Sequence, residues 1–66
     1  MRNPERLDVF YEELKRLHKE YLPDWRFGQF IFNLMAETGD PFFYEEDAML
    51  EVIKKYIADT TGKEVK

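Results

Sequence analysis

The side chains best suited to chemistry in this sequence are a small group of acids and a single histidine. The acids lie close together in the chain: Asp40, Glu45, Glu46 and Asp47. Carboxylates are the ligands that hard cations prefer, but calcium loops place them at set spacings around a glycine turn, and that pattern is absent. We therefore expect the acids to begin a helix, whose positive dipole end they stabilise. The sequence predicts no metal site and no cofactor.

His18 has no recognisable catalytic partner in the sequence. General base catalysis needs a shaped cleft and a second group that orients the imidazole, and no motif supplies either. The chain contains neither cysteine nor serine, which removes the commonest nucleophiles. We expect a structural or solvated role for His18 and a protein that is not an enzyme.

A polar strip, Arg26, Gln29 and Asn33, offers the side chains that read guanine and adenine edges in DNA. Charge argues against this use, since residues 21–58 carry more acidic than basic side chains, the reverse of what phosphate contacts require. A small nucleic-acid-associated regulator that uses this strip is therefore the alternative hypothesis, and a solvated or capping face is the simpler interpretation.

These side chains must be positioned by helices, because apolar residues recur at spacings of three and four through most of the chain. The first helix is predicted from about residue 4 to about 21, with Asn3 as its cap, Pro4 at its first position and Pro23 ending it. Asp24 is expected to cap a second helix over about 25–37, which Gly39 ends. A third helix is predicted from about 45–47 to about 58.

The second predicted helix has an unusually wide apolar face. Its central stripe consists of Phe27, Phe30, Ile31, Leu34 and Met35, and Trp25, Gly28, Phe32 and Ala36 widen it. A surface helix normally shows a much narrower stripe. We therefore expect this helix to be the middle element of the domain, or half of an interface. Gly28 indicates a tight helix crossing, within the fold or between two subunits.

The segments "RNPERLD", "PDWRFGQFIFNL" and "DPFFYEED" together resemble a group of small bacterial and phage proteins of uncharacterised function. That group has an Arg-x-Pro-x-Arg-type beginning, a Pro-Asp-x-Arg-x-Gly-Gln-x-Ile-x-Asn-Leu segment and an Asp-Pro-Phe-Tyr-x-Glu-Asp segment. The likeness extends from Arg2 to about Asp47, and the last segment here carries an extra aromatic residue. The resemblance implies a small helical fold and brings no activity with it.

The chain has 66 residues, including one tryptophan, four tyrosines and six phenylalanines, so most of these rings must serve as core. Those left over are expected to bind a protein partner or a second copy in a homodimer: Trp25, Phe32, Phe42, Phe43 and Tyr44. The last three could instead fold back as a lid over the bundle end. The lid is the simpler interpretation for most of these three residues, and the partner surface is the functional alternative, because contiguous exposed apolar area is rare on monomers.

The sequence thus predicts an all-α fold, a small three-helix bundle-like domain with an aromatic loop between the second and third helices. The domain is expected to span residues 1–58 and a flexible C-terminal tail to span 59–66. No apolar run approaches the roughly 18 residues of a membrane span. With no cysteine and a formal net charge of −4, we expect a cytoplasmic protein-interaction module with little attraction to membranes.

Overall fold

The computed structural model describes residues 3–66, and within this range it consists of three α-helices joined by loops. Helix α1 spans Arg6–Tyr21, α2 spans Phe27–Thr38 and α3 spans Glu46–Thr61. Met1 and Arg2, which the predicted domain and the resemblance include, lie outside the described residues. The predicted all-α, three-helix fold is confirmed.

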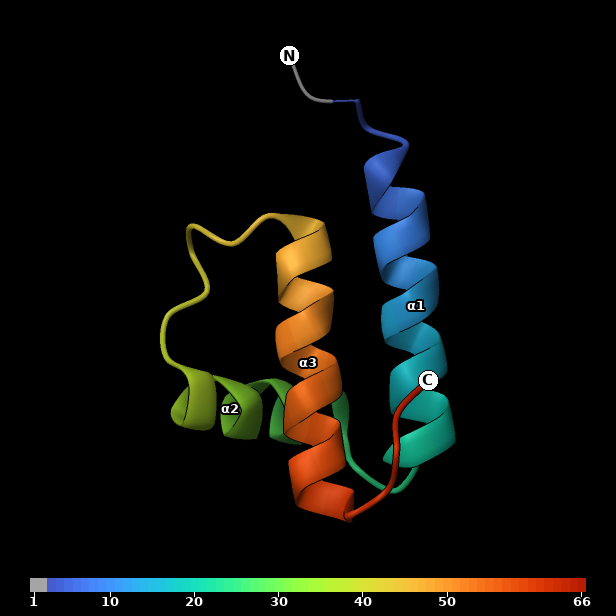
Figure 1. Cartoon of the computed structure of the whole chain (residues 1–66), viewed down its shortest axis with the longest axis vertical. Coiled ribbons are helices and arrows are strands. Elements are labelled where there is room, and N and C mark those ends of the chain that lie inside the picture. Colours follow the sequence, from blue (N-terminus) through green and yellow to red (C-terminus); the bar gives the residue numbers. More distant parts are fainter. Residues whose placement is uncertain (1–2) are drawn as a thin grey trace.

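Helices α1 and α3 lie side by side and run in the same direction, and α2 crosses near their C-terminal ends (Figure 1). The loop after α2 leads back toward the N-terminal end of α1, and α3 begins there. Because of this return, α3 can run in the same direction as α1. Helix α3 packs against both α1 and α2. The middle element is therefore α3, and the prediction that the second helix lies in the middle was wrong.

Helix α2 is not the middle element because it crosses the α1–α3 pair, and only one strip of its surface meets the other helices. Phe30 and Leu34 are its buried residues. Phe27 and Met35, which the sequence places on the same stripe, are 59% and 41% exposed. Among residues 3–66, the buried core is Leu17, Leu22, Phe30, Leu34, Ile53, Tyr56 and Ile57.

The helix starts differ from the predicted ones. Asn3 accepts a hydrogen bond from the Glu5 backbone N–H at 2.9 Å, but it caps a turn, and α1 begins only at Arg6. Asp24 does not cap α2. Its place is taken by Arg26, an extended residue whose backbone N–H donates to Gln29 Oε1 at 2.8 Å. Trp25 therefore precedes α2 instead of belonging to it.

The C-terminal end of α3 extends past Asp59, where the sequence predicted a tail. Helix α3 ends at Thr61, and Gly62 follows in the left-handed conformation at φ 73°. The chain then turns back beside α1 (Figure 1). Val65 packs against the core, and the Arg16 guanidinium donates a hydrogen bond to the Lys66 carbonyl oxygen. In this structure Lys66 thus contacts α1, and Val65 belongs to the packed part of the domain.

Gly28 inside α2 and Gly39 at its C-terminal cap are expected to respond to alanine in opposite directions. A Cβ at Gly28 would meet nothing within 4 Å, so the tight crossing predicted there does not occur within the chain. Gly28→Ala should raise the free energy of unfolding by about 0.5–1 kcal/mol, because alanine loses less backbone entropy in a helix. Gly39 has φ 86° and ψ −167°, a region that is essentially limited to glycine, so Gly39→Ala should cost about 1–3 kcal/mol.

Urea unfolding followed by circular dichroism measures both changes. Neither new Cβ meets another atom, so steric clashes do not contribute to either change. A difference between the two variants therefore reports the backbone conformation alone. Equal stabilities for the two variants would contradict the backbone explanation.

Candidate functional site

The loop between α2 and α3 presents two aromatic rings to solvent. Phe42 is 78% exposed and Phe43 is 90% exposed, and their ring centroids lie 4.9 Å apart in an edge-to-face contact. Local hydrogen bonds hold the loop: Phe42 N–H donates to Asp40 Oδ1 at 3.0 Å, and Tyr44 N–H donates to the Pro41 carbonyl at 3.0 Å. The rings therefore project outward, and the loop is not a lid over the core.

The other predicted partner residues lie elsewhere. Phe32, 64% exposed, borders a shallow hollow of α2 together with Met35 and Ala36. Tyr44 is 43% exposed and borders a separate hollow with residues of α3. Trp25 is half-buried and packs against the core. The structure thus brings Phe42 and Phe43 together but does not join all five residues into one surface.

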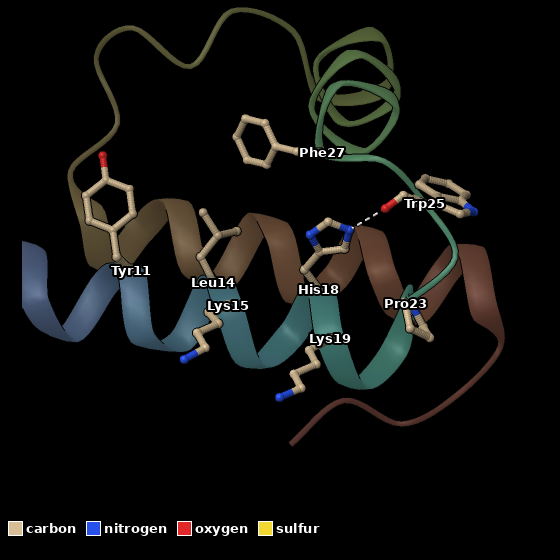
Figure 2. Close-up of a pocket in the computed structure, with 8 residues that line it drawn as sticks. All are labelled: Tyr11, Leu14, Lys15, His18, Lys19, Pro23, Trp25 and Phe27. Atoms are coloured by element: carbon tan, nitrogen blue, oxygen red, sulfur yellow. Dashed lines mark hydrogen bonds between the residues drawn. The ribbon is translucent and has the colours of Figure 1, made fainter.

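A groove that the sequence did not predict lies between α1 and the start of α2 (Figure 2). It has a volume of about 420 Å³ and is lined by Tyr11, Leu14, Lys15, His18, Lys19, Pro23, Trp25 and Phe27. Tyr11 and Phe27 are 61% and 59% exposed although their spacing placed them on core faces. The sequence held no signal for this groove, because it depends on the crossing of α2.

His18 forms one wall of the groove and links it to the core. Its Nε2 lies 2.7 Å from the Trp25 carbonyl oxygen, as Figure 2 shows, and its ring centroid lies 5.1 Å from that of Phe30. The hydrogen bond ties α1 to the segment before α2. His18 thus makes contacts that join α1 to the core and to the segment before α2.

The acidic residues at the start of α3 have local partners. Glu46 accepts a hydrogen bond from Arg6 Nε, an ion pair that joins the first turns of α3 and α1. Asp47 Oδ1 accepts the Ala48 N–H at 2.8 Å. Among the described residues, no group of three histidine, cysteine or acidic side chains is placed to hold a metal ion.

The polar strip of α2 faces solvent. Arg26, Gln29 and Asn33 are all exposed. The side-chain oxygen of Gln29 accepts a hydrogen bond from the Arg26 backbone N–H and so caps the start of α2. The capping interpretation therefore accounts for the most central of the three side chains.

Charged residues on the outer face of α1 form a network around Arg16. Its guanidinium donates to Glu13 Oε2 at 3.0 Å and to Glu20 Oε2 at 2.9 Å. The hydrogen bond from Arg16 lowers the pKa of Glu13, and the bonds to the two acids raise the pKa of Arg16. Glu13 and Arg16 are half-buried and Glu20 is exposed. Since Arg16 also donates to the Lys66 carbonyl oxygen, the network links α1 to the C-terminal segment.

No helix in residues 3–66 is both long enough and apolar enough to cross a membrane. The chain matches no family model, no curated protein and no solved structure.

Proposed function

We propose that this chain is a non-catalytic protein-interaction module that self-associates through its exposed aromatic side chains. The observation that supports this most is the Phe42–Phe43 pair, two large rings held almost completely in solvent by a turn. Burial of a phenylalanine side chain against a partner contributes roughly 1.5–3 kcal/mol. A rigid pair of such rings loses little conformational freedom when it binds.

The distribution of apolar side chains supports the same proposal. Phe32 adds a third phenylalanine that is mostly exposed, on the outer side of α2. Aromatic side chains are enriched in interfaces and often provide most of the binding energy. The fold does not need these rings for its own core, because that core is formed by other residues.

Sedimentation velocity over micromolar to millimolar concentrations tests the proposal. We expect the wild-type protein to sediment faster as its concentration rises, and the triple variant Phe32→Ala, Phe42→Ala, Phe43→Ala to sediment as a monomer throughout. Its stability should be nearly unchanged, since exposed side chains contribute little to folding.

Val9→Ala is the matched control, because Val9 is 66% exposed but lies on α1 outside the proposed surface. This variant should associate as the wild type does. A wild-type protein that remains monomeric at every concentration would overturn the proposal.

A further inference from the structure

We infer that the aromatic loop of one copy docks in the α1 groove of a second copy. This inference rests on the proposed self-association and names the two surfaces that meet. Here the aromatic loop means residues 40–47, that is, the loop after α2 together with the first two residues of α3. The α1 groove means the hollow lined by Tyr11, Leu14, Lys15, His18, Lys19, Pro23, Trp25 and Phe27.

The two surfaces are complementary in charge. The lining of the α1 groove includes Lys15 and Lys19 and no acidic side chain. Both lysines leave α1 on the side away from Phe27 (Figure 2), so their ammonium groups lie at the outer edge of the groove and not inside it. The aromatic loop is bounded by Asp40 on one side and by an acidic segment ending at Asp47 on the other, within which Glu46 is already paired with Arg6. In a chain with a net charge of −4, this groove is a basic site suited to an acidic ligand.

The two surfaces also match in polarity, and the groove has the size of a binding pocket. The α1 groove, at about 420 Å³, lies within the 300–1,000 Å³ range of typical binding pockets. Its walls include Tyr11, Trp25 and Phe27, whose rings favour contacts with other aromatic rings. Phe42 and Phe43 are the most exposed large apolar side chains described.

The occupant must come from another molecule in this arrangement. Within one chain Phe42 and Phe43 remain solvent-exposed and contribute nothing to the lining of the groove. If two copies are related by a two-fold axis, each loop meets the partner's groove and the contact forms twice. The rings would then supply the affinity, while the lysines would steer the encounter and set the register.

Sedimentation of mixed variants tests the pairing. Phe42→Ala with Phe43→Ala removes the loop contact, and Lys15→Glu with Lys19→Glu reverses the charge of the groove. Each variant alone should associate at least about tenfold more weakly than the wild type. An equimolar mixture should recover part of the association, because one intact loop meets one intact groove. Lys63→Glu with Lys66→Glu, an equal charge change on exposed residues that belong to neither surface, should associate as the wild type does.

A blocked peptide of residues 40–47 provides a second readout. Trp25 is the only tryptophan of the chain and lines the groove, and the peptide contains none. Peptide addition should change the Trp25 fluorescence in a saturable manner. A peptide with both phenylalanines replaced by alanine should not change it, and the Lys15→Glu, Lys19→Glu protein should bind the original peptide at least about tenfold more weakly.

The outcomes separate the two proposals. A wild-type monomer at all concentrations would overturn self-association itself, and the docking inference with it. Wild-type association that survives both double variants, or a mixture that recovers nothing, would overturn only the docking of loop in groove.

Discussion

Replacing Phe30 by alanine should lower the free energy of unfolding by about 3–5 kcal/mol. Phe30 is fully buried between α2 and the rest of the core, and its ring also contacts the ring of His18. The lower stability has two causes: the ring is no longer buried away from water, and a cavity remains in its place. A core in a domain of this size supplies roughly 3–5 kcal/mol in total, so most Phe30→Ala molecules should be unfolded.

Phe32→Ala is the matched control, the same change two positions along the same helix. Phe32 is 64% exposed, so its replacement should change the unfolding free energy by less than about 0.5 kcal/mol. Circular dichroism at 25 °C, with urea titration of any folded fraction, measures both variants. If the two variants unfolded at the same urea concentration, Phe30 would not occupy the core position described.

Leu17→Ala should be the second most damaging change, at about 2–5 kcal/mol. Leu17 is fully buried and is the buried residue of α1, so it fixes this helix against the rest of the fold. Its loss leaves a cavity where α1 meets the core and weakens the packing of the two parallel helices. The same urea titration measures the effect, and amide hydrogen exchange should show that α1 loses protection.

Val9→Ala is the control for this change on α1. Val9 is 66% exposed, and alanine has a higher helix propensity than a β-branched residue, so this variant should be as stable as the wild type or slightly more stable. Equal losses from Leu17→Ala and Val9→Ala would contradict the assignment of Leu17 as the buried residue of α1.

The existence of three helices and most of the core could be predicted because they depend on short-range patterns. Apolar spacing places Leu17, Leu34 and Ile53 on inner faces, and the structure buries all three. Pro23 and Gly39 mark helix ends for local steric reasons that apply in any fold. Leu22 was missed, because it is buried outside regular helix, where periodicity carries no information.

The candidate site could be predicted only in part. Phe42 and Phe43 were correctly separated from the helical pattern, but sequence could not decide between a lid and an exposed loop. That choice depends on where the loop leaves the end of α2 relative to α3. Tyr11 and Phe27 were assigned to core faces, since spacing shows which residues share a face but not how much of that face is covered.

Sequence alone determined the helical content, the approximate helix ends and the residues available for a core, because each follows from interactions over a few neighbouring positions. Only the tertiary structure decided that α3 is the middle helix, that α2 crosses the other two, and that a basic aromatic groove opens beside Trp25. The crossing angle depends on how side chains distant in sequence fit together, and no local pattern encodes that fit.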